Sequence, residues 1–320
     1  MSVLYLLSPG SSVRKEGGRL VVEKDGDLVA RVPLRMLTSV VVGASAGATI
    51  PALFACMEEA VPIFFVDGRS NVVGQLAGEN ITLRMLRYQL AYAEDTEKGL
   101  VLSKEIVAEK LRGQYRLLKT YEKTVDDVRI AKALHILKPM RAKIERADTA
   151  DALRGMEGTC ARAYFAAFPA LLDVQRWLFR GRGERPARDP VNALLNYGYA
   201  FLEREVRLAL IGHGMDVRIG FFHATDGRRT SLVFDLMEPF RASLVDRFVL
   251  SLLRKGSLKP DDFETTKKAG CRLLDEARSI WYGRYEAYME KPYQEYEGKT
   301  PRALIDGYVE AFAQRVQKTF

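Results

Sequence analysis

The sequence predicts an α+β protein in which a small β-rich domain precedes a larger all-α domain. Over the first 78 residues, short β-branched runs alternate with turns. From Asn80 onward, the apolar residues recur with a helical period. The tripeptide Gly-Glu-Asn at 78–80 marks the boundary between the two patterns. We therefore expect a β-rich domain over residues 1–78, a connector helix over 79–98 and a helical domain over 99–320.

The expected strands of the first domain are short apolar runs. Lys24–Asp27 contains an Asp-Gly step between two such runs, which is a strong β-hairpin signal. A helix is expected behind Thr49 and Pro51, where the proline suits a first helical turn. The expected strands are Val3–Leu7, Leu20–Glu23, Leu28–Val32, Ser39–Val42, Val61–Val66 and Asn71–Gln75, and the expected helix is Ala52–Ala60.

The rest of the chain reads as helices joined by loops. The clearest loop is 181–190, which closes with Asp189 as the cap and Pro190 as the first-turn proline of the next helix. The expected helices are Ile81–Tyr92, a long basic stretch at about 100–145, and segments near 149–168, 189–213, 236–255 and 266–290.

Composition is that of a globular protein, and 320 residues suffice for two domains with full cores. The longest uncharged run, 36–57, contains Gly43, Gly47 and Pro51 in two periodicities, so we interpret it as strand, turn and short helix instead of a membrane span. Residues 1–13 lack the pattern of a secretory signal, so a cytoplasmic protein is expected. The three cysteines, Cys56, Cys160 and Cys271, have no CxxC spacing and are expected to be buried thiols.

The net charge of +8 lies entirely beyond residue 75, because residues 1–75 hold seven Lys/Arg and seven Asp/Glu. Residues 104–146 hold twelve basic and six acidic side chains, and 176–188 hold five arginines and one glutamate. Such stretches suit contact with phosphate backbones, although a solvated helix face explains the first equally well. The five arginines repel one another unless an anion draws them together. Aromatic residues at 281–285 could stack on bases, but packing is the more common role.

One histidine lies just upstream of an acidic pair. His223, Asp235 and Glu238 could hold a divalent ion together with a distant acid, and Glu157 is the candidate because it lies on an apolar helical segment. One imidazole and two or three carboxylates suit Mg²⁺ or Mn²⁺ better than zinc.

Each of these residues also has a structural interpretation. Asp235 and Glu238 could form a capping box at the start of a helix. His223 could be a structural histidine. Glu157 could simply pair with Arg154 or Arg162.

Three segments of the chain resemble the CRISPR adaptation integrases, the universal CRISPR-associated proteins that insert new spacers into the repeat array. The resemblance extends in the family's order across most of the helical region, and the β-rich part is similar as well. The segments are 155–158 with 161–165 (GMEG, ARAYF); 185–186 with 189–198 (RP, DPVNALLNYG); and 220–223 with 231–232 and 235–241 (GFFH, SL, DLMEPFR).

The resemblance implies that Glu157, His223 and Glu238 ligate a metal, with Asp235 close by as a further catalytic residue. Many relatives carry Asp at the position of Glu238, so which of Asp235 and Glu238 binds directly stays open. The implied partners are a second copy of the chain joined through the N-terminal dimerisation domain, a small ferredoxin-like adaptation subunit in a heterohexamer, prespacer duplex DNA and the CRISPR repeat. The arginines assigned to DNA contact are Arg162, Arg182, Arg185, Arg188, Arg228 and Arg241.

The expected function is a metal-dependent DNA integrase and endonuclease that inserts prespacer 3′ ends into a CRISPR array by transesterification. His223 would act as a neutral ligand, so activity should fall at acid pH. The alternatives are a general metal-dependent DNA repair nuclease and a non-catalytic DNA-binding scaffold. The repair nuclease would cut without joining ends, and the scaffold would bind DNA regardless of EDTA.

Overall fold

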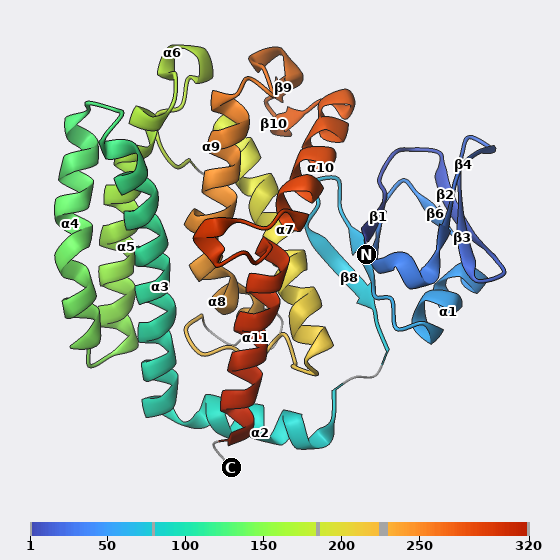
Figure 1. Ribbon diagram of the computed structural model, residues 1–320, viewed down its shortest axis with the longest axis horizontal. Coiled ribbons are helices and arrows are strands. Elements are labelled where there is room, and N and C mark those ends of the chain that lie inside the picture. Colours follow the sequence, from blue (N-terminus) through green and yellow to red (C-terminus); the bar gives the residue numbers. More distant parts are fainter. Residues whose placement is uncertain (1, 79–80, 184–185, 224–229, 319–320) are drawn as a thin grey trace.

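The computed structural model describes residues 2–78, 81–183, 186–223 and 230–318. A small lobe of strands lies at one side of a larger lobe of helices (Figure 1). The expected α+β class, with the β-rich part first, is therefore confirmed. In the small lobe β8 ends at Leu76, and the first long helix of the large lobe begins at Leu83.

Two four-stranded sheets build the small lobe. The first has the order β1-β5-β7-β8, with β8 antiparallel to β7 and the other neighbours parallel. The second has the order β4-β3-β2-β6. The strands are β1 (Ser2–Leu6), β2 (Ser11–Glu16), β3 (Arg19–Lys24), β4 (Asp27–Pro33), β5 (Leu37–Gly43), β6 (Gly47–Ala48), β7 (Ile63–Val66) and β8 (Val72–Leu76), with helix η1 (Leu34–Met36) and helix α1 (Ile50–Glu58) between them.

The expected hairpin joins β3 to β4. Asp25 and Gly26 both have positive φ, 52° and 92°, as the tight two-residue turn requires. Strand β2 was not anticipated, because its sequence SSVRKE is mostly polar. Only Ser11 and Val13 of β2 are buried. The strand is therefore stabilised mainly by its backbone pairing with β3 and not by an apolar face.

Helices form the large lobe, with α7 surrounded by the others. Sixteen residues of α7 are buried. The helices are α2 (Leu83–Glu94), α3 (Thr96–Glu122), α4 (Val128–Glu145), α5 (Ala150–Ala167), η2 (Phe168–Leu171), α6 (Val174–Trp177), α7 (Pro190–Gly212), α8 (Ser231–Phe240), η3 (Arg241–Asp246), α9 (Arg247–Arg254), η4 (Pro260–Asp262), α10 (Asp275–Glu290), η5 (Gln294–Tyr296) and α11 (Pro301–Lys318).

The helix expected near 236–255 is present as α8, the π-helical turn η3 and α9, which follow one another without a break; Pro239 in α8 has no N–H to donate to the preceding turn. One expectation for the large lobe was wrong. The helix expected from 266 begins only at Asp275, because β9 (Phe263–Thr266) and β10 (Gly270–Leu273) form an antiparallel hairpin ahead of it. The lobe is therefore not all helix.

The two lobes are packed together through β1. Tyr5 donates its hydroxyl to Glu286 of α10 at 2.7 Å, and its ring stacks on Phe201 and Tyr282 with centroids 5.9 and 5.1 Å apart. These contacts join the edge of the first sheet to α7 and α10. The position of the small lobe against α7 is thus fixed by specific side chains.

Buried groups elsewhere agree with the expected packing. All three cysteines are free and buried, as expected. Trp281 and Tyr285 are also buried, so these two rings pack in the core and do not present a stacking surface. No helix among the described residues is long and apolar enough to cross a membrane.

Candidate active site

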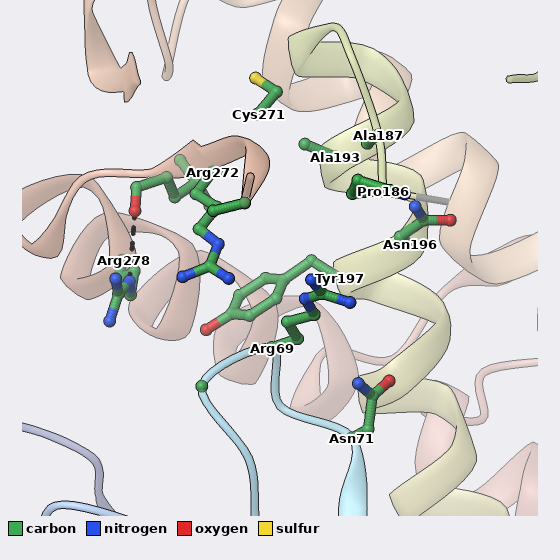
Figure 2. A pocket seen from close by; sticks show the side chains of 13 residues that line it. Arg69, Asn71, Pro186, Ala187, Ala193, Asn196, Tyr197, Cys271, Arg272 and Arg278 are labelled. Carbon is green, nitrogen blue, oxygen red and sulfur yellow. Dashed lines mark hydrogen bonds between the residues drawn. The ribbon is translucent and has the colours of Figure 1, made fainter. Parts of the chain in front are cut away.

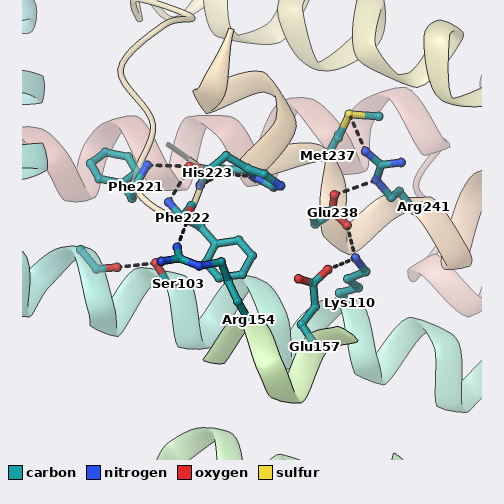
Figure 3. A network of polar contacts seen from close by, with 12 residues as sticks. Ser103, Lys110, Arg154, Glu157, Phe221, Phe222, His223, Met237, Glu238 and Arg241 are labelled. Atoms are coloured by element: carbon teal, nitrogen blue, oxygen red, sulfur yellow. Dashed lines mark hydrogen bonds and ion pairs between the residues drawn. The ribbon is translucent and has the colours of Figure 1, made fainter. Parts of the chain in front are cut away.

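Two glutamates from separate helices meet at a lysine of a third. Glu157 on α5 and Glu238 on α8 both form ion pairs with the ammonium of Lys110 on α3, at 2.6 Å for Glu238 Oε2 (Figure 3). The side chains of Glu238, Lys110 and Glu157 are only 5%, 12% and 21% exposed. Helices α3, α5 and α8 therefore gather two carboxylates, 81 residues apart in the chain, at one largely buried position.

Asp235, one turn before Glu238 on α8, holds the segment that carries His223. Its carboxylate accepts the backbone N–H groups of Phe221, Phe222 and His223 at 2.6, 3.0 and 2.9 Å. It also contacts Nδ1 of the His223 ring at 2.6 Å. With both oxygens used in this way and no exposed surface, Asp235 fixes the tautomer and orientation of the imidazole instead of facing a ligand.

The approach of this segment to α8 requires a glycine. A Cβ at Gly220 would lie 2.7 Å from Cβ of Ser231 and 2.8 Å from Oδ2 of Asp235. Any side chain there would push the segment off the helix. The Gly-Phe-Phe-His sequence is therefore explained by close packing ahead of the histidine.

The imidazole edge opposite Asp235 faces the glutamates (Figure 3). The hydrogen bond with Asp235 raises the pKa of His223 above its usual value, and the charges of Glu238 and Glu157 add to this effect. Burial opposes ionisation of Glu238, but Arg241 and Lys110 outweigh it and lower the pKa of that carboxyl. The side chains of His223, Glu238 and Glu157 are thus within electrostatic range of one another.

The geometry contradicts the alternative structural roles considered for Asp235, Glu238 and Glu157. Helix α8 begins at Ser231 with Thr230 as its N-cap, so Asp235 and Glu238 lie inside the helix and form no capping box. Glu157 pairs with Lys110, whereas Arg154 pairs with Asp151. Arg162, the other candidate partner of Glu157, donates to the hydroxyl of Thr159.

The donor types in this cluster are those that a hard divalent ion prefers. The Lys110 ammonium is a cation in contact with both glutamates, so the position between them already favours positive charge. Carboxylate oxygens with one imidazole suit Mg²⁺ and especially Mn²⁺. In the present rotamers no three His, Cys, Asp or Glu side chains of the described ranges are close enough to share an ion, and the Lys110 ammonium contacts both acids.

The arginines assigned to DNA contact lie in different surroundings. Arg162 and Arg188 are exposed. Arg182 is partly buried and donates to Asn192 and Asn196, the two asparagines at the start of α7. Arg241 pairs with Glu238 at 2.8 Å and stacks on Tyr199, so it belongs to the carboxylate cluster. Arg185 and Arg228 lie outside the described residues.

Sequence reasoning missed Lys110, which was counted only as part of the basic stretch. A signal was present in its spacing. Lys110 shares a helical face with Ile106 and Leu117, both of which are buried. A lysine on an apolar face needs an acidic partner, and that need could have identified it.

A second, buried polar cluster lies near the site, and sequence reasoning did not predict it. Asp246, at the end of the π-helical turn η3, accepts hydrogen bonds from the hydroxyls of Tyr199 and Tyr164 at 2.6 and 2.8 Å. Burial raises the pKa of this carboxyl to about 6, although the two tyrosines lower it. The cluster ties η3 to α5 and α7, the helices on either side of the site.

Comparison with solved structures shows which proteins share this fold. A Cas1 protein from Thermotoga maritima superposes with a TM-score of 0.84 over 98% of this chain and 97% of its own, at 22% sequence identity. A casposase bound to an integration product superposes with a TM-score of 0.81 over 100% and 92% of the two chains, at 24% identity. The fold is therefore shared with both of these solved structures.

Sequence comparison then gives the family itself. The model of the family described as CRISPR associated protein Cas1 matches residues 4–287. A CRISPR-associated endonuclease Cas1 of Rhodospirillum rubrum is 35% identical over 311 residues, 92% of this chain and 89% of its own. Another, from Thermus thermophilus, is 35% identical over 275 residues, 86% and 82% of the two chains. The chain belongs to the Cas1 family.

Proposed function

We propose that this chain is a divalent-metal-dependent DNA integrase and endonuclease that joins prespacer 3′ ends to a CRISPR repeat by transesterification. The observation that carries the proposal is the meeting of Glu157 and Glu238 at one buried cation, with the ring of His223 directed at the same position. Replacement of the 3′-hydroxyl by water would give nicking instead of joining.

Glu157, Glu238 and His223 would hold the ion, and Mg²⁺ or Mn²⁺ suits these donors. When bound, such an ion polarises a phosphate oxygen, favours deprotonation of an attacking hydroxyl and offsets the charge of an in-line displacement. Asp235 acts through His223, because it keeps Nδ1 occupied and leaves Nε2 as the ligating nitrogen.

The basic residues around the cluster would position DNA. Arg241 lies beside Glu238, where its guanidinium can offset charge on a bound phosphate. Exposed Arg162 and Arg188, with Arg182, would contact the backbone, and Arg185 and Arg228 are proposed for the same role. Such contacts supply affinity without reading sequence.

The proposed partners are prespacer duplex, repeat DNA, a second copy of the chain through the N-terminal lobe, and a small ferredoxin-like subunit in a heterohexamer. Support comes from the fold likeness to one chain of a Cas6-RT-Cas1–Cas2 complex, with a TM-score of 0.83 at 23% identity; this chain spans 35% of that one. The casposase structure is of that protein on its integration product, which supports DNA joining as the activity of this fold.

The test is an integration assay with a short duplex, a supercoiled repeat plasmid, the adaptation subunit and Mn²⁺. Joined half-site products should form, and EDTA should abolish them. Glu157→Gln and His223→Ala should lose the products with the fold intact. The matched controls are Glu276→Gln and His135→Ala, because Glu276 and His135 are exposed and away from the cluster.

Three other outcomes would contradict the proposal. Undiminished joining in both site variants would remove the metal assignment. Cutting without joining would favour a general repair nuclease. DNA binding without either activity, unaffected by EDTA, would favour a non-catalytic scaffold.

A further inference from the structure

A long groove lies between helices α3 and α11 (Figure 1). The end of α8, the π-helical turn η3 and the short helix η5 also line it, and it holds about 2350 Å³ not filled by protein atoms, part of it open to solvent. Within the part of the chain that the structure describes, it shares no lining residue with the hollow that Figure 2 shows between α7 and the β9–β10 hairpin. Neither Glu157 nor Glu238 lines it. The groove is therefore a surface separate from the carboxylate cluster.

One wall of the groove is a row of charged side chains along α3. The row consists of Glu105, Glu109, Arg112, Arg116, Lys119 and Lys123. These positions alternate steps of four and three residues, the spacing with which one helix packs along another. At about 1.5 Å per residue, the row is about 27 Å long, or about five helical turns. It has an acidic end and a basic end.

The floor and the opposite wall of the groove are apolar. Phe240 lies at the end of α8, and Leu304 and Tyr308 are one turn apart on α11. The rings of Phe240 and Tyr308 pack edge to face with centroids 5.4 Å apart, and Tyr296 donates its hydroxyl to the carbonyl of Ser243 at 3.0 Å. Leu304 and Tyr308 are only half-buried. An apolar floor between two helices is the shape that receives an amphipathic helix.

The acidic end of the row is already neutralised within the chain. Glu105 pairs with Arg315 of α11 at 2.6 Å, and Glu109 pairs with Arg112 of α3 at 2.7 Å. Basic side chains on a partner would have to compete with these arginines. The charge that selects a partner therefore lies elsewhere in the row.

The basic end retains charge that the chain does not balance. Lys119 pairs with Glu122. Arg116 and Lys123 are exposed, and neither forms an ion pair with a carboxylate of the described residues. The macrodipole of α3 favours basic residues only in its last turn, which does not include Arg116. This end of the groove is therefore complementary to acidic side chains.

We propose that the groove binds a helical segment of a partner protein, with apolar side chains toward Leu304 and Tyr308 and acidic side chains opposite Arg116 and Lys123. A DNA duplex is a poorer match, because it would meet paired charges over half of the row and apolar side chains along the floor. Neither attracts a phosphate backbone. The inference does not depend on the proposed function, since the groove lies outside the carboxylate cluster.

The first test is a selection, by the full chain, from a displayed library of helix-forming peptides. The peptides have about 20 residues, enough to cover the row. Enriched sequences should carry large apolar residues at i, i+3, i+4 and i+7 and acidic residues near one end. No enrichment, or enrichment of peptides without acidic residues, would overturn the inference.

The second test is a titration of a labelled peptide of the enriched pattern. Arg116→Glu/Lys123→Glu should bind it about tenfold more weakly or worse, since two attractions become repulsions. A peptide with lysine in place of the acidic residues should prefer this variant over wild type. The control Lys132→Glu/Lys138→Glu makes the same charge change on exposed residues of α4 and should bind within about twofold of wild type. Equal affinity of all three proteins for the acidic peptide would overturn the inference.

Leu304→Ala tests the apolar wall separately. Because Leu304 is only half-buried, the smaller side chain leaves the fold intact. Affinity for the same peptide should fall about 3- to 10-fold through lost apolar contact. Unchanged affinity would place the peptide outside the groove and overturn the assignment.

Two measurements address the other occupants of such a groove. Affinity for a labelled DNA duplex should be the same in Arg116→Glu/Lys123→Glu and in Lys132→Glu/Lys138→Glu, and a loss confined to the first variant would assign the row to DNA and overturn the inference. The sedimentation mass of Arg116→Glu/Lys123→Glu should equal that of wild type. A smaller mass would assign the groove to a second copy of the chain, which would also overturn it.

Discussion

Replacing Lys110 by methionine tests whether the lysine holds the place of a divalent ion. Lys110→Met keeps the apolar stem and removes the ammonium that touches Glu157 and Glu238. The two carboxylates then lose their shared counter-charge. We expect the variant to be less stable in EDTA and to bind Mn²⁺ more tightly than wild type, because the ion no longer displaces an internal cation.

The magnitude follows from burial. Removing one partner of a buried ion pair costs about 3–5 kcal/mol. Arg241 remains on Glu238 at 2.8 Å and the Glu157 side chain is 21% exposed, so both carboxylates keep partial compensation. We therefore expect a loss of about 2 kcal/mol in EDTA. Mn²⁺ at a hundredfold excess over its dissociation constant should raise the free energy of unfolding of the variant by about 2.7 kcal/mol.

The assay is denaturant unfolding at pH 7.5 with EDTA and with a Mn²⁺ titration, together with direct Mn²⁺ binding by calorimetry. The dissociation constant for Mn²⁺ should fall at least about tenfold in the variant, which corresponds to about 1.4 kcal/mol. Lys119→Met is the matched control, because Lys119 lies on the same helix and pairs with Glu122 at the surface. Its stability should change by less than about 1 kcal/mol.

Two results would refute this reasoning. If Lys110→Met binds Mn²⁺ more weakly than wild type, the lysine assists the ion instead of substituting for it. If Mn²⁺ stabilises wild type and variant equally, the ion does not lie between Glu157 and Glu238.

Three further changes have predicted outcomes. Asp235→Asn should reduce strand joining about 10- to 100-fold by releasing His223; since Asp235 raises the pKa of that imidazole, the acid limb of the activity profile should move to lower pH. In the wild type, burial raises the pKa of Asp246 from 3.8 to about 6, so ionisation disfavours folding and the free energy of unfolding should fall as pH rises from about 4 to 6. The fall corresponds to about 3 kcal/mol. Asp246→Asn should abolish this pH dependence. Arg302→Met should cost about 3–5 kcal/mol in denaturant unfolding, since it leaves Glu205 buried without its partner.

The controls for these changes come from the same chain. Asp275→Asn should leave both joining and its pH profile unchanged, because Asp275 is exposed and pairs only with Arg278 among the described residues. Arg129→Met, which removes an exposed pair with Asp127, should cost less than about 1 kcal/mol. An Asp246→Asn variant with the wild-type slope between pH 4 and 6 would contradict the assigned pKa. Asp235→Asn with full activity would show that its carboxylate only packs the loop.

The sequence was most informative where local rules determine structure. The Asp25-Gly26 turn was predictable because positive φ at both positions suits those residues. The start of α7 was predictable because Asp189 caps it, accepting the N–H of Asn192 at 2.8 Å, and Pro190 fits the first turn. Such features depend on residues a few positions apart, so one sequence contains the whole signal.

Features that depend on distant partners were less accessible. The β9–β10 hairpin was taken for helix because its strands are four residues each and β9 is mostly exposed, so neither shows a clear alternation. Glu157, His223 and Glu238 could be named from motifs, but the place of Lys110 between the acids depends on how α3 packs against α5 and α8. The role of Asp235 could not be predicted from the sequence either, because only the fold shows that its carboxylate accepts the backbone N–H groups of Phe221 and Phe222.

The π-helical turn over 241–246 sets how the two halves of one long helix are rotated about their common axis. Each residue of an α-helix advances the direction of a side chain by about 100°. Deleting Ser243 would let an ordinary α-helix run from α8 into α9, with every later side chain turned by about that angle. Asp246 would then point away from both tyrosines while Glu238 stayed in place. The π-helical turn therefore lets one continuous helix direct Glu238 to Lys110 and Asp246 to the two buried tyrosines. A regular α-helix with the same residue spacing would not direct both acids in this way.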